Sequence, residues 1–554
     1  MWRGLFGAAA CALAFVSGGA ATAVEGAAAP AESRPRLIVT IVVDQFGANL
    51  FNQYRPHFTG GLRRLALEGL VYASGYQTHG MTETCPGHST VLTGVHPNRT
   101  GIAANDWIDR EAGRPVYCLA APANTLADGG AGENGPVGPD ALRSTGLGDW
   151  LKAASGTNRV YAVSGKDRGA INLAGAHADG TFWYADGFGF TTYLRPGDTA
   201  ADRLRAVAAL NGRLSERMAR PAPLWATPDS RCEGLAGAWT VGGETFESRL
   251  PPTRLKVDTS PVLDELTLEA AEALVREQNL GGGEGVDLLG VSLSGTDRIG
   301  HRYGSQGPEM CQQLHRLDAA LGRFLEALES VPGGVLVVLT ADHGGSDFVE
   351  RLSVRGYPEA QRADPTLLAR LNGEVRRRIS LDFDPLWGDG NGVYVLARDR
   401  KGMAEPMRSE VAVVTAELLR AEPGVRAAFA IEELVATREA ARSIDPESLT
   451  VRDRLALSAV PGRSADVIFV LEPGMTPFTG AVGGYVAGHG TPWDYDRRVP
   501  IVFWRPGASG QERALPIRTV DIGPTLAGAA GVAAPQDLDG RCLDLEALGL
   551  PACD

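Results

Sequence analysis

The stretch Gly-Val-Leu-Val-Val-Leu-Thr-Ala at residues 334–341 is the most apolar strand-like run of this chain, and it is followed directly by Asp342 and His343. Short apolar runs bounded by turn residues are typical of strands buried in a parallel sheet. Ligands of α/β proteins gather where such strands end, at the carboxyl edge of the sheet. A carboxylate and an imidazole at that position predict a metal site.

Two further apolar runs end in the same way. Residues 37–43 (Leu-Ile-Val-Thr-Ile-Val-Val) lead into Asp44, and residues 288–294 lead to Asp297, with His301 four residues later. A spacing of four on a helical turn places both side chains on one face, so both can reach one ion. We therefore predict an α/β fold, with a central, mostly parallel sheet flanked by helices and one polynuclear metal site at its edge.

A histidine between two glycines, His489, completes the set of candidate ligands. The flanking glycines let that loop approach an ion closely. Aspartate and histidine without thiolate favour zinc over manganese or iron. We expect two ions, each with three ligands: Asp297, His301 and His489 for one, and Asp44, Asp342 and His343 for the other.

The chain has 554 residues, 44% of them hydrophobic, with 70 glycines and 34 prolines, which predicts a large core with many turns and long loops. The strand–helix rhythm weakens at about 119–284 and 345–464, and strand-like runs return at 466–471 and 500–504. We expect one α/β domain over residues 37–554 with large insertions in those two regions. Insertions of this kind are where substrate specificity is expected to reside.

The first 23 residues have the features of a signal peptide. Arg3 supplies a positive charge, residues 5–16 are apolar, and Ala-Thr-Ala at 21–23 is a small-residue cleavage site. The apolar run is too short to span a membrane, and residues 24–36 have the composition of a flexible leader. We expect a periplasmic or secreted protein.

The net charge is −13, and removal of Arg3 with the signal would make it −13 − 1 = −14. Such an acidic protein is not suited to binding nucleic acid or anionic lipid by general electrostatics. Any phosphate ligand must therefore be held by local cations or metals. The sequence does not indicate the oligomeric state.

Seven cysteines are present, and Cys11 would leave with the signal. An even count in an oxidising compartment favours disulfides over free thiols. Cys542 with Cys553 is the easiest pairing to predict, because it closes a short loop, and the other pairings stay open. The six remaining cysteines are Cys85, Cys118, Cys232, Cys311, Cys542 and Cys553.

Residues 81–90 (Met-Thr-Glu-Thr-Cys-Pro-Gly-His-Ser-Thr) open a predicted helix, with proline suited to its first turn. Exposed N–H groups at a helix start attract anions, so a hydroxyl or thiol there is a candidate nucleophile. Three residues compete: Thr84, Cys85 and Ser89. A disulfide would exclude Cys85 as a nucleophile, and the sequence around Ser89 lacks the last glycine of a nucleophile elbow. Residue chemistry favours Thr84 only slightly.

Lys166 and Arg168 follow a strand-like run at 160–163, and alternation places both on one side, where they could grip two oxygens of one phosphoryl group. A lysine and an arginine at this spacing are more commonly a solvated charged turn. Asn105 could donate to a further oxygen, although an isolated asparagine more often caps a turn.

These residues, in this order, resemble the alkaline phosphatase superfamily. They are most similar to the bacterial secreted alkaline phosphatases with a threonine nucleophile, of the Sphingomonas and PafA type, which are close to the nucleotide pyrophosphatase/phosphodiesterase group. The resemblance extends from residue 37 to residue 525, nearly the whole mature chain. The matching positions are Asp44, Thr84, Asn105, Lys166, Arg168, Asp297, His301, Asp342, His343 and His489.

The resemblance implies hydrolysis of phosphate monoesters with two zinc ions and a covalent phospho-threonine on Thr84. One zinc would be held by Asp297, His301 and His489. The other would be held by Asp44, Asp342 and His343 together with the Thr84 oxygen. The non-bridging phosphoryl oxygens would be bound by Asn105, Lys166 and Arg168. The natural substrate and the presence of a third ion stay open.

Other functions fit the residues less well. Residues 85–88 do not give the C-x-P-x-R pattern of sulfatases. The phosphodiesterase branch shares the ligands and the threonine, but a monoester carries the extra charged oxygen that Lys166 and Arg168 would recognise. A phosphate-binding protein would not need a hydroxyl beside two metals. A phosphomutase acts on cytosolic sugar phosphates, which a secretion signal argues against.

Overall fold

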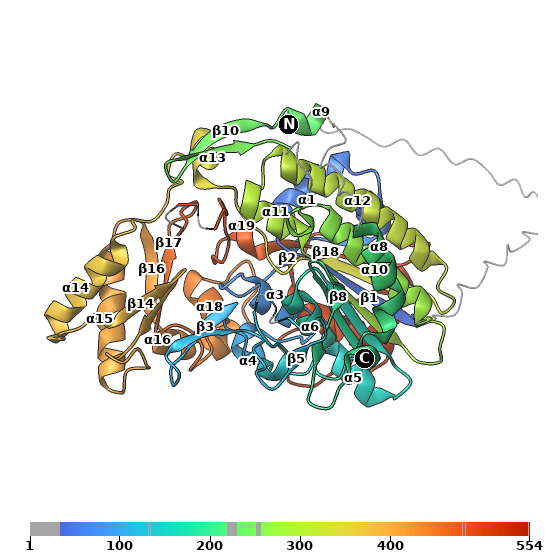
Figure 1. Ribbon diagram of the computed structural model, residues 1–554, viewed down its shortest axis with the longest axis horizontal. Helices are drawn as coiled ribbons and strands as arrows, with labels where there is room; N and C mark the ends of the chain where they lie inside the picture. Colours follow the sequence, from blue (N-terminus) through green and yellow to red (C-terminus); the bar gives the residue numbers. More distant parts are fainter. Residues whose placement is uncertain are drawn as a thin grey trace, which may run out of the picture.

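The central sheet has ten strands within the residues that the computed structural model describes, namely 34–130, 132, 134–218, 230–250, 256–478, 480–481, 483–551 and 553 (Figure 1). The expected signal peptide lies outside these residues. Nine strands follow the order β19-β2-β18-β13-β1-β12-β6-β7-β8, and β20 pairs with β2. Their bounds are β1 Leu37–Val43, β2 Leu70–Tyr76, β6 Val160–Ser164, β7 Gly180–Ala185, β8 Gly189–Thr191, β12 Asp287–Leu293, β13 Val335–Thr340, β18 Arg498–Trp504, β19 Gln511–Arg513 and β20 Ile517–Arg518.

The five middle strands, from β13 to β7, pair in parallel, and the antiparallel pairs involve β18 and β8 towards the two ends of the sheet. Every residue of β1, β12 and β13 is buried, which explains why these strands are almost continuously apolar. The mostly parallel sheet predicted from the sequence is confirmed. Because the three strands are parallel neighbours, their carboxyl ends meet at one edge.

Helices cover both faces of this sheet (Figure 1). Helices α10 (Val262–Glu277) and α12 (Pro308–Glu329) lie on one side, and α3 (Thr84–Val91), α5 (Leu147–Ala154) and α6 (Asp167–Ala174) lie on the other. The second side carries the residues proposed to meet the substrate phosphate. The fold therefore brings α3 and α6 to the edge where β1, β12 and β13 end.

A buried carboxylate joins α12 to the start of α2 (Gly61–Glu68). Asp318 Oδ2 accepts from the backbone N–H groups of Thr59 and Gly60, at 2.6 and 2.7 Å. Its Oδ1 accepts from those of Leu62 and Arg63, at 2.7 and 3.3 Å. The first N–H groups of a helix have no acceptor within it, so the Asp318 carboxylate supplies the acceptors that α2 itself lacks.

Asp318→Ala should lower the free energy of unfolding by roughly 3 kcal/mol, because it leaves buried backbone donors without an acceptor. Urea denaturation followed by circular dichroism measures this change. Glu326→Ala, at an exposed position of the same helix, is the matched control and should change stability by less than about 0.5 kcal/mol. Equal effects of the two substitutions would contradict the role of Asp318.

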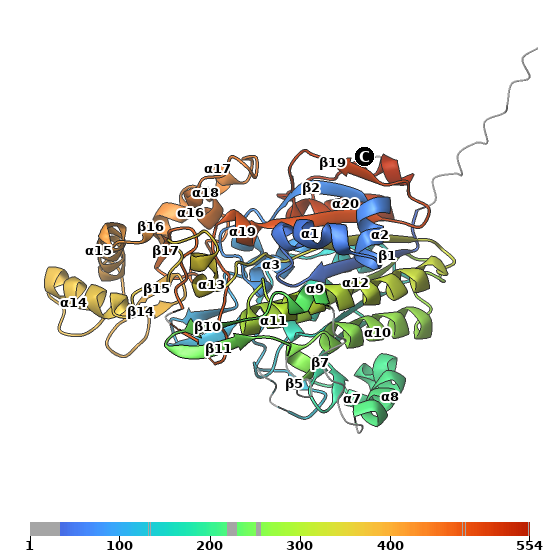
Figure 2. The same ribbon diagram turned by 90° about the horizontal axis from the view of Figure 1, so that it is seen from above.

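A second, smaller sheet lies at one end of the molecule (Figure 1, Figure 2). Its strands follow the order β14-β15-β17-β16, and α14 and α15 pack against it. The strand-like run at 466–471 belongs here, whereas that at 500–504 joins the central sheet as part of β18. Three strands of the central sheet, β6, β7 and β8, fall inside the region 119–284. The bounds are β14 Leu386–Asp389, β15 Gly392–Val395, β16 Val425–Ala430, β17 Val467–Leu471, α14 Leu367–Ile379 and α15 Met407–Ala421.

The six expected cysteines form three disulfides: Cys85–Cys118, Cys232–Cys311 and Cys542–Cys553. The predicted pairing of Cys542 with Cys553 is confirmed. Cys85 is bonded and is therefore not available as a thiol. None of the helices in the described parts of the chain combines the length and apolar character that crossing a membrane requires.

Candidate active site

Three buried aspartates lie where the middle strands end. Asp44 directly follows β1, Asp342 follows β13, and Asp297 lies in the first turn of α11 (Gly295–Tyr303), after β12. Their side chains are at most 3% exposed. The structure brings together both predicted ligand sets, and within each set the candidate ligand atoms lie within 4.8 Å of one another. The sets are Asp297, His301 and His489, and Asp44, Asp342 and His343.

Each histidine of these two sets is fixed by its Nδ1 atom. Nδ1 lies 2.8 Å from the Ala487 carbonyl oxygen in His301, 2.9 Å from that of Gly344 in His343, and 2.8 Å from that of Thr82 in His489. A carbonyl oxygen can only accept, so Nδ1 carries the hydrogen and donates. In a neutral imidazole the Nε2 atom then keeps its lone pair, which is the form in which histidine binds a metal.

The Nε2 atoms face each other and the carboxylates. The Nε2 atoms of His301 and His489 are 3.2 Å apart, and they lie 3.3 and 3.4 Å from Asp297 Oδ1. His343 Nε2 lies 3.4 Å from both Asp44 Oδ1 and Asp342 Oδ2. Burial lowers the pKa of His343 to about 3, so its imidazole is neutral. Facing lone pairs and carboxylates are stable together when a cation lies between them, so the arrangement fits metal ions.

Buried polar atoms without a hydrogen-bond partner in the described part of the chain support the same conclusion. Three of them belong to the two ligand sets: Asp44 Oδ1, Asp297 Oδ1 and His343 Nε2. Buried polar groups are nearly always satisfied, so each exception calls for an explanation. A third group of possible ligands, Cys232, Cys311 and His315, includes a disulfide whose sulfurs are already bonded to each other.

Lys166 lies between the two ligand sets, at the N-cap of α6. Its Nζ is 2.6 Å from Asp44 Oδ2, and it also contacts Asp297 Oδ2. The side chain is buried, so it is not part of a solvated charged turn. Burial and the neighbouring carboxylates of Asp297 and Asp342 raise the pKa of Asp44 well above its usual range. The raised pKa reflects the burial and mutual repulsion of three carboxylates around one ammonium group, which bound cations would relieve.

Helix α3 starts beside these ligands, with Thr84 buried at its first position. The helix approaches the end of β13 so closely that a Cβ added at Gly87 would lie 2.2 Å from the backbone oxygen of Asp342. His88 connects the two elements, since its Nδ1 lies 3.0 Å from both the Asp342 carboxylate and the Thr84 carbonyl oxygen. His88 was not among the predicted site residues, although its position one helical turn after Thr84 is a signal that could have identified it.

The structure separates the three candidate nucleophiles. Cys85 is in a disulfide. Ser89 is fully buried, donates to the Pro86 carbonyl oxygen at 2.8 Å and contacts the Thr100 hydroxyl at 3.0 Å. Thr84 stands at the N-terminal end of the helix, where the helix dipole favours an anion. The geometry therefore favours Thr84 over both alternatives.

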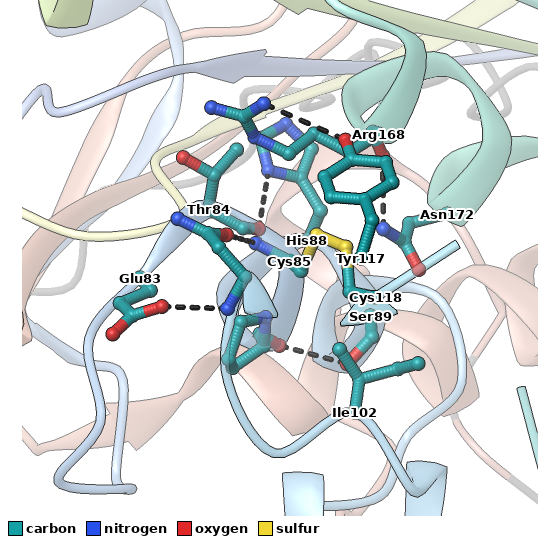
Figure 3. Close-up of a disulfide and its surroundings, with 12 residues drawn as sticks. Glu83, Thr84, Cys85, His88, Ser89, Ile102, Tyr117, Cys118, Arg168 and Asn172 are labelled. Atoms are coloured by element: carbon teal, nitrogen blue, oxygen red, sulfur yellow. Dashed lines mark hydrogen bonds between the residues drawn. A yellow bond between two sulfur atoms is a disulfide. The ribbon is translucent and has the colours of Figure 1, made fainter. Parts of the chain in front are cut away.

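Asn105 is held against the same helix end. Its side-chain oxygen accepts from the Cys85 N–H at 2.8 Å, and its own backbone N–H donates to Glu83 Oε2 at 2.6 Å. Because the amide oxygen is engaged with α3, the NH₂ end is the one left to meet a ligand. Arg168 lies in the first turn of α6, and Figure 3 shows the hydrogen bond between its side chain and the Tyr117 hydroxyl.

Two cavities adjoin these residues. The first, of about 270 Å³, is lined by Asn105, His301 and His489 together with apolar and aromatic side chains that include Tyr394 and Phe478. The second, of about 400 Å³, is lined by Lys166 and Arg168 among others. The predicted phosphate-binding residues thus lie on the walls of cavities large enough to admit a small ester.

Comparison with known proteins identifies the family. The family model for type I phosphodiesterase / nucleotide pyrophosphatase matches residues 38–492. This chain belongs to that family. It is 39% identical to the alkaline phosphatase PhoK of a Sphingomonas species, over 93% of this chain and 92% of that protein. It is 38% identical to the alkaline phosphatase PhoD of Zymomonas mobilis, over 94% and 90%.

The fold of this type I phosphodiesterase family member matches the crystal structure of the alkaline phosphatase PafA. The TM-score is 0.78 at 25% identity, and the match covers 92% of this chain and 98% of that one. Relatives named as alkaline phosphatases thus span nearly the whole chain. The protein is an enzyme of the phosphatase type, and the family resemblance read from the sequence is confirmed.

Proposed function

We propose that the enzyme hydrolyses phosphate monoesters in the periplasm, using two zinc ions and a covalent phospho-threonine intermediate on Thr84. The observation that carries the proposal is the pair of buried ligand sets, with Lys166 between them and Thr84 beside them. The relatives named as alkaline phosphatases support monoester hydrolysis. The disulfides and the signal-peptide features of residues 1–23 support export.

The ligands suit zinc because they combine neutral imidazole nitrogens with carboxylate oxygens and include no thiolate. Asp297, His301 and His489 would hold one ion, and Asp44, Asp342 and His343 the other, with the Thr84 oxygen as a further ligand. When bound, such ions supply positive charge that lowers the pKa of a hydroxyl and opposes charge on a leaving oxygen. Magnesium prefers more oxygen donors than these sets offer.

Reaction would begin with Thr84. Its Oγ forms a bond to phosphorus, the bond from phosphorus to the alcohol oxygen breaks, and the hydroxyl proton is lost to solvent. The departing alcohol takes a proton from water. In the second half a water oxygen bonds to phosphorus, the bond to Thr84 Oγ breaks, and inorganic phosphate leaves. Thr84 recovers its proton, so the enzyme returns to its starting state.

The transition state of phosphoryl transfer spreads charge over three equatorial oxygens. The ammonium of Lys166, the guanidinium of Arg168 and the NH₂ group of Asn105 would oppose that charge. Because they are fixed before the reaction, they need little reorganisation as it occurs. The alcohol portion would occupy the first cavity, beside Tyr394 and Phe478.

Phosphodiester hydrolysis is the second candidate, because the matching family model is described by that activity. A diester carries one charged oxygen fewer than a monoester. Two cations near one phosphoryl group therefore favour the monoester, by charge-assisted contacts that a diester would not fully use. Hydrolysis of an aryl phosphate monoester and of an aryl phosphate diester, compared as kcat/KM, separates the two activities.

Dialysis against a chelator should abolish hydrolysis, and added zinc should restore it better than magnesium does. The reason is the donor set, which contains three imidazole nitrogens and too few oxygens for a magnesium site. Activity and bound metal, the latter by elemental analysis, are measured on the same samples. Full activity in a sample shown to be free of metal would overturn the two-metal proposal.

A further inference from the structure

The Cys85–Cys118 disulfide joins two parts of the candidate site (Figure 3). Cys85 follows Thr84 in the first turn of α3, and Cys118 follows β4 (Arg114–Tyr117). Both sulfurs belong to fully buried residues. The residue before each cysteine has a polar side chain at the site: Thr84 on one side and Tyr117 on the other.

Tyr117 contacts both charged residues at the start of α6. Its hydroxyl donates to Asp167 Oδ1 at 2.7 Å and accepts from an Arg168 guanidinium nitrogen at 3.5 Å. Asp167 is itself held by the side chain of Asn134 at 3.0 Å. Asp167 Oδ1 also accepts from the Arg168 backbone N–H at 2.7 Å. The tyrosine hydroxyl therefore stands between a fixed carboxylate and the end of the arginine side chain.

The same cross-link also borders Asn105. The backbone N–H of Cys118 donates to the Asn105 carbonyl oxygen at 2.8 Å, and that of Cys85 donates to its side-chain oxygen at 2.8 Å. The backbone and side-chain oxygens of Asn105 thus accept hydrogen bonds from the two cysteines of one disulfide. Three groups proposed to meet the phosphoryl group, from three separate segments, are connected through it: Thr84, Asn105 and Arg168.

The guanidinium of Arg168 needs a contact that fixes its position. Its side chain has many rotamers, and its Nε is buried without a hydrogen-bond partner in the described residues. Lys166 pairs with Asp44 and Asp297, whereas within the described residues the Tyr117 hydroxyl is the hydrogen-bonding partner at the guanidinium end of Arg168. A preorganised cation stabilises a transition state more than a mobile one does.

We propose that Tyr117, held in place by the Cys85–Cys118 disulfide, positions Arg168 against the phosphoryl oxygens and thereby sets the preference for monoesters over diesters. Tyr117 is a positioning residue, because it acts through Arg168 and is not itself placed to meet the substrate. This inference rests on the proposed function, which assigns Arg168 to the phosphoryl group.

A double-mutant cycle with Tyr117→Phe and Arg168→Ala tests the proposal. Phenylalanine keeps the ring and removes the hydroxyl. We expect Tyr117→Phe to lower kcat/KM for an aryl phosphate monoester about 10-fold, and for a diester less than about threefold, since one charge-assisted contact is affected. In the Arg168→Ala background the same substitution should have no further effect, because residues that act through one another are not additive.

The disulfide is tested by the double substitution Cys85→Ala/Cys118→Ala, with Cys542→Ala/Cys553→Ala as the matched control. The control disulfide closes a short loop near the chain end. We expect the first pair to lower the monoester-to-diester ratio of kcat/KM about 10-fold or more, and the second to leave that ratio unchanged. The affinity for inorganic phosphate should fall in the first pair while bound zinc is retained.

The outcomes distinguish this inference from the proposed function. If Arg168→Ala lowers monoester and diester hydrolysis equally, the role of Arg168 in the proposed function is wrong. If Arg168→Ala is selective but Tyr117→Phe lowers activity equally in both backgrounds, or lowers both substrates equally, the positioning role of Tyr117 is wrong. If the Cys85→Ala/Cys118→Ala variant does not fold, the double-mutant cycle of Tyr117→Phe and Arg168→Ala still tests the positioning role of Tyr117.

Discussion

Thr84→Ala should lower kcat for an aryl phosphate monoester by roughly 10⁴-fold or more, because removing a nucleophile leaves no route to the covalent intermediate. Thr84 stands at the N-terminus of α3, next to the ligand loop that contains Asp342. Alanine keeps the backbone of Thr84 and loses only a hydroxyl and one methyl group, so the fold and most of the bound zinc should be retained. Steady-state kinetics, circular dichroism and metal analysis on one preparation measure the three quantities.

Ser89→Ala is the matched control, since it removes a hydroxyl from the same helix. Ser89 bonds to Pro86 and Thr100 in the interior, so its loss should affect stability more than chemistry. Acid quenching during turnover of a labelled monoester should trap phosphate on the wild-type protein and not on the Thr84 variant. An inactive Ser89 variant together with an active Thr84 variant would show that the nucleophile is assigned wrongly.

Lys166→Ala and Arg168→Ala should each lower kcat/KM for monoesters by roughly 10- to 100-fold, as expected for the loss of one charge-assisted contact. The loss should be much smaller for diesters, which have one charged oxygen fewer. Replacing both should erase much of the preference between the two substrate classes. The measurement is the ratio of kcat/KM for an aryl monoester to that for an aryl diester, determined in each variant.

Lys166 and Arg168 differ in their partners, so their substitution has different effects on the metal ligands. Lys166 pairs with Asp44 and Asp297, so its removal also changes the charge around both ligand sets. Arg168 pairs with Tyr117 instead. Bound zinc should therefore be measured in both variants. Equal losses on monoester and diester would show that the residues only position the loop, and a wild-type preference for the diester would favour the phosphodiesterase activity.

Much of the site could be predicted because its residues follow strands that are recognisable locally. Asp44, Asp297 and Asp342 each follow a run of apolar residues, and runs buried on both faces are read from composition alone. Once the strands are parallel neighbours, their ends must share an edge. The sequence therefore predicted both ligand sets, and the structure brings the members of each set together.

The nucleophile and the phosphate-binding residues were less certain, because they depend on partners distant in the sequence. Three candidates stayed open at the start of α3, and the sequence favoured Thr84 only slightly. The disulfide of Cys85 and the interior bonds of Ser89 come from contacts that no local pattern contains. The local pattern around Lys166 is more commonly a solvated charged turn, and only the fold places this residue between Asp44 and Asp297.

The sequence by itself determined the strands, the carboxylates and histidines at their ends, and the even set of cysteines, because each follows from short-range pattern and composition. The tertiary structure alone decided the disulfide pairing of Cys85 with Cys118, the place of β17 in the smaller sheet, and the contact of Tyr117 with Arg168. These depend on packing between segments far apart in the chain. Such contacts form only when the whole core is assembled, so no window of the sequence encodes them.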